Sequence, residues 1–175
     1  GDISAATVGD LLAGRPGTLV FPSVFGGNPV ISNHLNPYPR NHRLKLIHRP
    51  SGDPDRTQRL GPYILESLID ADEEGAGTAY RVRIAPHERT AVSYHRVAEE
   101  YYYVLAGRGV AILDGREYPL APGDFLRLPP GTTHGFVTGD EPLEMLDIHT
   151  PGSRPDRDVY FVDGAAPEGF SELKE

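Results

Sequence analysis

Two histidines and one glutamate stand where they could hold a metal ion together. His95 ends one apolar segment and Glu100 begins the next, with Arg96 to Glu99 between them. An antiparallel hairpin sets these two side chains next to each other if both point to the same face. His134 follows a Pro-Pro-Gly turn and opens another segment. Imidazole nitrogens and a carboxylate are common ligands of Fe, Mn, Zn, Ni and Co, and three such ligands leave positions open for substrate or dioxygen.

These residues lie in a part of the chain whose pattern is typical of strands. From about residue 62, apolar or aromatic segments recur at regular spacing between turns rich in Gly, Pro and Asp. Asp114-Gly115 between alternating residues is a strong signal for a two-residue hairpin. Short strands at this spacing predict an all-β sandwich or barrel. The predicted strands are 62–69, 78–85, 90–95, 100–106, 109–113, 116–120, 125–128, 134–138 and 143–149.

Two segments resemble the paired motifs of the cupin superfamily. Residues 93–109 read SYHRVAEEYYYVLAGRG and resemble the first motif, G-x5-H-x-H-x3/4-E-x6-G. In that comparison His95, Glu100 and Gly107 match the second histidine, the glutamate and the closing glycine. Residues 123–134 read GDFLRLPPGTTH and fit the second motif, G-x5-P-x-G-x2-H, at every fixed position, with His134 last.

The resemblance, which covers roughly residues 62–150, implies both a fold and a cofactor. The fold is a double-stranded β-helix, or jelly-roll barrel. The cofactor is one divalent metal ion on His95, Glu100 and His134, with Fe(II) favoured and Mn, Ni, Zn or Co also suited to these ligands.

Three positions depart from the family pattern. Ser93 stands where the first motif has its first histidine, His87 replaces the leading glycine, and Thr138 replaces a common closing asparagine. A neutral hydroxyl is a far poorer ligand than imidazole. The chain therefore either binds metal with three residues or has kept the cavity without a metal, with Ser93 facing a substrate.

Alternation along the strands assigns neighbours to the site. Tyr102 shares the face of Glu100 and would line the cavity, with its hydroxyl as donor or proton carrier. A core tyrosine with its hydroxyl bound to backbone predicts the same pattern. Phe136 shares the face of His134 and is expected to form an apolar wall.

The direction in which two further strands face is open. Asp147 and His149 are in phase on one face of 143–149. Facing inward, His149 is a candidate acid or base, or a replacement ligand for Ser93; the outward orientation is favoured. Arg81 and Arg83 are candidates to bind an anionic substrate, although a strand edge facing solvent predicts the same alternation.

The length of 175 residues suits one domain. We expect an irregular N-terminal extension over 1–60, the barrel over 61–163 and a C-terminal tail over 164–175. The extension includes a short helix at 5–13 and would serve as a lid or a dimer arm; nothing places its His34, His42 and His48 near the metal. The acidic residues 70–74 read as a hairpin loop. The resemblance also implies a homodimer.

The net charge of −8 argues against a nucleic-acid binder and against docking on anionic membranes. No run of 18 apolar residues is present, and the first residues lack the pattern of a signal peptide. The absence of cysteine excludes a disulfide framework and a thiol nucleophile. A cytoplasmic location is the default expectation.

Two classes of function remain. The favoured one is a metal-dependent enzyme acting on a small molecule, with an Fe(II)-dependent oxygenase first and a redox-neutral isomerase, lyase or cyclase second. In the redox-neutral version Tyr102 or His149 serves as general base. The other class is a non-enzymatic small-molecule-binding cupin, which Ser93 favours.

Overall fold

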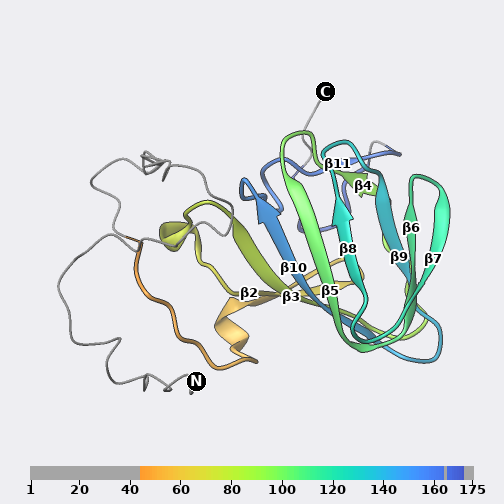
Figure 1. Ribbon diagram of the computed structural model, residues 1–175, viewed down its shortest axis with the longest axis horizontal. Coiled ribbons are helices and arrows are strands. Elements are labelled where there is room, and N and C mark those ends of the chain that lie inside the picture. Colours follow the sequence, from red (N-terminus) through yellow and green to blue (C-terminus); the bar gives the residue numbers. More distant parts are fainter. Residues whose placement is uncertain (1–43, 164, 172–175) are drawn as a thin grey trace, which may run out of the picture. The chain divides into compact units, whose positions relative to one another are not determined.

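A computed structural model of the chain describes residues 44–163 and 165–171, in which nearly all regular structure is β, as predicted (Figure 1). All strand pairs are antiparallel. One sheet has the order β1-β2-β3-β10-β5-β8, and the other β11-β4-β9-β6-β7. The first contains β1 (Thr57–Leu60), β2 (Tyr63–Ser67), β3 (Thr78–Ile84), β5 (Glu99–Gly107), β8 (Phe125–Leu128) and β10 (Leu143–Thr150). The second contains β4 (Ser93–Tyr94), β6 (Gly109–Leu113), β7 (Arg116–Leu120), β9 (His134–Val137) and β11 (Tyr160–Phe161).

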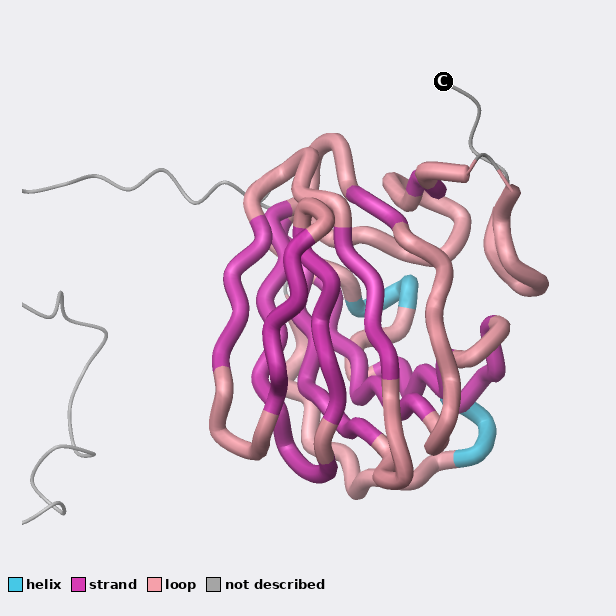
Figure 2. Tube along the Cα trace, turned by 90° about the vertical axis from the view of Figure 1, so that its right-hand side faces the viewer, coloured by secondary structure: helices cyan, strands magenta, loops and turns pink. Residues whose placement is uncertain are grey.

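The two sheets share one apolar core. Val82, Val104 and Met145 of the first sheet and Ala111 and Phe136 of the second belong to one buried cluster. Helical structure in the described residues is limited to two 3-10 turns, Pro54–Arg56 and Ala71–Glu73 (Figure 2). No helix in this part of the chain has the length and apolar character needed to cross a membrane. The predicted jelly-roll barrel is therefore confirmed as the fold class.

The predicted strands agree closely with the observed ones. β6, β7 and β8 have the predicted bounds, whereas the predicted strand 90–95 is only Ser93–Tyr94. The sheet begins earlier than predicted. β1 (Thr57–Leu60) falls within the predicted extension 1–60, but it pairs with β2, with Leu60 opposite Tyr63. The acidic residues 70–74 lie in the β2–β3 connection and include a 3-10 turn. The predicted helix 5–13, His34 and His42 lie outside the described residues.

The pairing of β10 with β5 contains a one-residue irregularity. Leu143 is opposite Gly107, but after a shift at Glu144 and Met145 the register places Met145 opposite Val104 and His149 opposite Glu100. One strand thus has an extra residue, which is a β-bulge. Beyond the bulge, the buried residues of β10 alternate with more exposed ones.

The closing glycine of the first motif has a steric role beside this bulge. Gly107 has a φ of +76°, which residues with a Cβ rarely adopt. A Cβ at this position would lie 1.7 Å from the carbonyl oxygen of Pro142. The close approach of β5 to the start of β10 therefore requires glycine.

Candidate metal centre

Four side chains from four parts of the barrel converge on one buried point. Glu100 is on β5, His134 opens β9, His149 is on β10, and His95 directly follows β4. All four are buried, and Glu100 is only 1% exposed. The Nε2 atoms of His149, His134 and His95 lie 3.0, 3.3 and 3.6 Å from the carboxylate oxygens of Glu100. The three predicted ligands lie together, and His149 joins them.

Backbone carbonyls fix the orientation of two imidazoles. His95 Nδ1 lies 2.5 Å from the carbonyl oxygen of Asp158, and His134 Nδ1 lies 3.2 Å from that of Thr132. A carbonyl accepts only, so Nδ1 carries the proton and Nε2 is left as the acceptor atom that faces Glu100. Metal-ligating histidines in proteins are held in the same way.

The second motif also holds the candidate ligand His95 in place. Gly131 has a φ of +86°, and its N–H donates to the carbonyl oxygen of His95 at 2.7 Å. The turn that precedes His134 thus ties the chain segments of both histidines together.

The donor set fits a divalent metal ion. Ligand atoms of His95, Glu100 and His149 lie within 4.8 Å of one another, and His134 Nε2 approaches the same carboxylate. Glu100 Oε2 is buried without a hydrogen-bond partner among the described residues. Such a group is costly to bury unless a cation or donor satisfies it. Imidazole nitrogens and a carboxylate suit Fe, Mn, Co, Ni or Zn.

Burial and the neighbouring charges shift the pKa values of the ionisable groups around Glu100. Burial opposes the ionisation of Glu100, but His134, His149 and His95 outweigh it and hold the pKa of its carboxyl well below the ordinary value. Burial lowers the pKa of His134, so this imidazole is readily neutral and able to bind a metal. Burial, followed by the Glu100 charge, raises the pKa of Asp147 well above its ordinary value.

The favoured outward orientation of Asp147 and His149 is wrong. Both are 5% exposed, because they are in phase with the buried Leu143 and Met145 on β10. The shared phase of Asp147 and His149 with the apolar Leu143 and Met145 was the signal in the sequence that they face inward. Asp147, absent from the predicted site, has its Oδ1 3.6 Å from His149 Nδ1, and both atoms lack a hydrogen-bond partner among the described residues.

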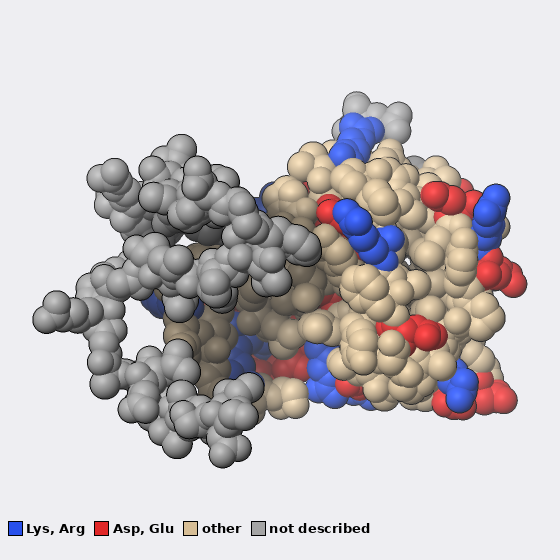
Figure 3. All heavy atoms as spheres, viewed as in Figure 1, with Lys and Arg blue, Asp and Glu red and all other residues tan. Residues whose placement is uncertain are grey.

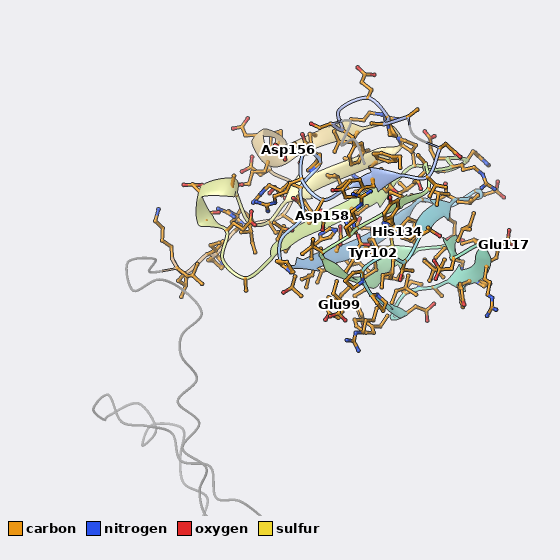
Figure 4. The ribbon with its side chains drawn as sticks, turned by 90° about the horizontal axis from the view of Figure 1, so that it is seen from above. Glu99, Tyr102, Glu117, His134, Asp156 and Asp158 are labelled. Atoms are coloured by element: carbon orange, nitrogen blue, oxygen red, sulfur yellow. The ribbon has the colours of Figure 1, made fainter. Side chains whose placement is uncertain are left out.

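A cavity of about 60 Å³ opens beside the three histidines. Tyr102 and Ser93 line it, as expected, and Ser93 Oγ lies 3.3 Å from His134 Nε2. Figure 4 shows Tyr102 and His134 in the interior, with Glu99 and Glu117 nearer the periphery. The apolar part of the wall comes from Tyr63, Leu65, Val82, Val159 and Phe170.

Three predicted contributors lie elsewhere. Phe136 is fully buried and packs edge-on against Tyr102 with ring centroids 5.0 Å apart, so it supports the wall from the core instead of forming it. Arg81 and Arg83 do not line the cavity. Arg81 is half-buried and pairs with Glu144 at 2.8 Å, and Arg83 is exposed. They are in phase opposite to the buried Val82 and Ile84 and therefore point to the outer face of the sheet.

Charged side chains on the face seen in Figure 3 are interspersed with uncharged ones, and positive and negative groups lie close together. This pattern is that of a solvated surface. His48 is exposed, and Glu99 lies on the outer side of β5, paired with Arg127.

Comparisons with known proteins agree with the fold. Residues 80–149 match the Cupin_2 family, described as "Cupin domain". An uncharacterized protein of Methanocaldococcus jannaschii is 34% identical over 102 residues, 57% of this chain and 82% of the relative. The polyketide synthase CurC of Streptomyces cyaneus is 34% identical over 90 residues, 51% of this chain and 58% of the relative. The structure of the polyketide cyclase RemF from Streptomyces resistomycificus has a TM-score of 0.55 at 25% identity, covering 69% of this chain and 86% of RemF.

Proposed function

The chain belongs to the cupin superfamily, and on this basis we propose that it is a metal-dependent enzyme that cyclises or dehydrates a small polyketide-like substrate without net oxidation. One observation carries the proposal: three imidazoles converge on the buried carboxylate of Glu100. The similarity to a polyketide synthase and to a polyketide cyclase supports the choice of substrate class.

His95, His134, His149 and Glu100 would hold the ion. A divalent metal bound there supplies Lewis acidity to a substrate oxygen, such as that of a ketone or enol. The chain itself orients the ligands through the carbonyls of Asp158 and Thr132. Burial keeps water away from the reacting oxygen.

The cavity wall favours an uncharged substrate. Among the described residues that line it, Arg154 is the only Lys or Arg. Its Nε donates to Glu74 at 2.8 Å and its Nη2 to the carbonyl oxygen of Ile69, so its charge is already neutralised. Apart from the metal ion, a phosphorylated or carboxylated substrate would find no unpaired Lys or Arg among these residues, whereas a ring with keto and hydroxyl groups suits the apolar wall.

Tyr102 would position that substrate. Burial, followed by the charge of Glu100, raises the pKa of its phenol well above the ordinary value. The hydroxyl therefore stays protonated at neutral pH and can donate a hydrogen bond to a substrate oxygen. The Ser93 hydroxyl, on the same cavity wall, can accept or donate a second one.

An Fe(II)-dependent oxygenase, which the sequence favoured, is the second candidate. The same imidazole and carboxylate donors suit Fe(II), and a ligand set with open positions admits dioxygen. The two candidates differ in one measurable respect, the consumption of dioxygen.

The first experiment is elemental analysis of protein purified without added metal. We expect close to one divalent metal ion per chain in the wild type and loss of most of it in His134→Ala. The matched control His48→Ala replaces an exposed histidine and should keep the metal content of the wild type. A wild type without metal that takes up no added Co(II) would overturn the proposal in favour of a metal-free binding protein.

The second experiment uses pentane-2,4-dione, a small 1,3-dicarbonyl, as probe. Its binding should shift the visible spectrum of the Co(II)-loaded protein, and Tyr102→Phe should weaken that binding without changing metal content. The Fe(II)-loaded protein should consume no dioxygen with this probe. Stoichiometric dioxygen uptake would favour the oxygenase over the cyclase.

A further inference from the structure

Asp158 connects the segment after β10 to the loop 95–98, which carries His95 and joins β4 of one sheet to β5 of the other. Its carbonyl oxygen accepts from His95 Nδ1 at 2.5 Å. Its carboxylate accepts the backbone N–H groups of Arg96 at 2.9 Å and Ala98 at 2.8 Å, with that of Val97 between them. One residue thus holds both the side chain of a metal ligand and the backbone that joins this ligand to Glu100.

The backbone of Asp158 is in an uncommon conformation. Its φ is +60°, in the left-handed region that few residues other than glycine adopt, although aspartate tolerates it better than most. This conformation costs free energy, which the contacts to His95 and to the 96–98 backbone offset. A residue held in this way at a candidate site suggests a functional reason.

The segment around Asp158 is also part of the cavity wall. Ser153, Arg154, Pro155 and Val159 line the cavity from this segment. Ser153 is 1% exposed and its Oγ lies 3.2 Å from His95 Nδ1 and donates to the carbonyl oxygen of Arg157 at 3.0 Å. The cavity wall and the support of His95 are therefore one piece of chain.

We propose that Asp158 is a positioning residue that couples closure of the wall segment 153–159 to the metal affinity of the site. With the segment in place, His95 presents Nε2 to the ion. When the segment lifts, His95 loses its Nδ1 acceptor and the 96–98 backbone loses three acceptor contacts. By thermodynamic reciprocity, a bound metal ion must then favour the closed segment. The inference rests on the proposed metal site.

The small size of the cavity indicates why the wall segment would need to move during substrate binding. About 60 Å³ is well below the roughly 300–1,000 Å³ of pockets that bind drug-sized ligands. A substrate with more than one ring would enter only when the wall segment moves. Entry of substrate would then loosen His95, and closure would restore it.

Other contacts hold the segment when Asp158 is changed. Glu74 pairs with Arg154 and with Arg157, and the Ser153 backbone N–H donates to Thr78 Oγ1 at 3.2 Å. A variant at Asp158 is therefore expected to fold, with the segment attached at its other end.

The test compares Asp158→Gly with Asp156→Asn. Glycine accepts a φ of +60° and keeps the carbonyl but removes the carboxylate. Asp156 lies in the same segment, is exposed and makes no contact with His95, so it controls for the lost negative charge (Figure 4). In Co(II) titrations followed by visible absorption, we expect affinity to fall about 10–100-fold in Asp158→Gly, as for other changes in groups that orient metal ligands. Asp156→Asn should match the wild type.

Hydrogen exchange supplies a readout that does not depend on activity. In the full-length wild type, Co(II) should slow exchange of amides in 153–159 as well as in 96–98. In Asp158→Gly the 96–98 amides should exchange faster even without metal. If this variant does not fold, Asp158→Asn, which also tolerates the left-handed region, takes its place with a smaller expected loss.

The results distinguish failure of the coupling through Asp158 from failure of the metal site. Equal Co(II) affinity in the wild type and the Asp158 variant, or Co(II) protection confined to 96–98, would overturn the coupling and leave the metal site intact. A wild type that binds no Co(II) at all would overturn the metal site, and the coupling with it.

Discussion

His149 and Glu100 are directly opposite each other in the pair formed by β10 and β5, and their side chains approach to 3.0 Å between Nε2 and Oε1. Ser93, where the first motif has a histidine, lies on β4 beside His134. The third imidazole of the site thus comes from β10, a strand outside both motifs. The loss of an imidazole at residue 93 is offset by one that reaches the same carboxylate from another strand.

Replacing His149 tests this relationship. In His149→Ala we expect Co(II) affinity to fall by more than about 100-fold, because a ligand is lost rather than a supporting group. Calorimetric titration would measure it, with the exposed His48→Ala as control. An affinity equal to that of the wild type would limit the ligands to His95, Glu100 and His134.

Two phenylalanines allow the contribution of a core side chain to the free energy of unfolding to be compared with that of a surface side chain. Phe136 is fully buried between the sheets, so Phe136→Ala should lower the free energy of unfolding by about 3–5 kcal/mol. Phe125 is 60% exposed on β8, so Phe125→Ala should cost less than about 1 kcal/mol. Urea unfolding would measure both. Similar losses in the two variants would contradict the placement of Phe136 in the core.

His87 stands where the first motif has glycine, and its φ is +60°. We expect His87→Gly to be about 1 kcal/mol more stable than His87→Ala, because glycine alone adopts this conformation without a steric penalty. The alanine variant controls for loss of the imidazole and its contact with Asp140. A shift of the urea midpoint in the opposite direction would contradict the left-handed backbone here.

Stability should depend on pH through Glu73. Hydrogen bonds from the Arg49 guanidinium, then from the Asp70 N–H, lower the pKa of the Glu73 carboxyl below its ordinary 4.5. The ionised carboxylate therefore stabilises the fold above pH 4.5, and this contribution is lost as pH falls through the folded-state pKa.

Glu73→Gln should therefore be less stable than the wild type at pH 7, and the difference should shrink as pH is lowered below 4.5. Urea unfolding at a series of pH values measures it, with Asp72→Asn, an exposed neighbour, as control. A difference that grows toward low pH would show that the pairing with Arg49 is not the cause.

The positions of the strands were predictable because turn residues punctuate them. Gly107 and Asp114-Gly115 mark places where the backbone needs a positive φ or a close approach, and side-chain type records such needs directly. The convergence of His95, Glu100 and His134 was predictable only because the spacing of the motifs resembles that of a known family.

The direction of a strand's two faces was harder to predict. Alternation shows that Asp147 and His149 share a face, but not which face is buried; for that, the phase of Leu143 and Met145 was needed. Arg81 and Arg83 met the same ambiguity and proved to face outward.

Asp158 could not have been predicted from pattern. It lies in an irregular segment without periodicity, and its partners are backbone groups some sixty residues earlier. Only the folded chain brings a carbonyl at 158 to an imidazole at 95.

The β-bulge between β5 and β10 decides which side chains of β10 reach Glu100. In an antiparallel pair, residues directly opposite each other point to the same side of the sheet. If Leu105 were paired with Met145 and no bulge were present, the register that joins Leu143 to Gly107 would continue and set Thr150, not His149, opposite Glu100. Deletion of Leu105 would remove the bulge and leave His149 opposite Glu100, whereas one residue inserted between Glu100 and Leu105, with the bulge kept, would set Thr150 opposite Glu100 and replace the imidazole beside the carboxylate by a hydroxyl. In this barrel, the length of β5 between Glu100 and the bulge therefore decides which side chain of β10 faces the carboxylate.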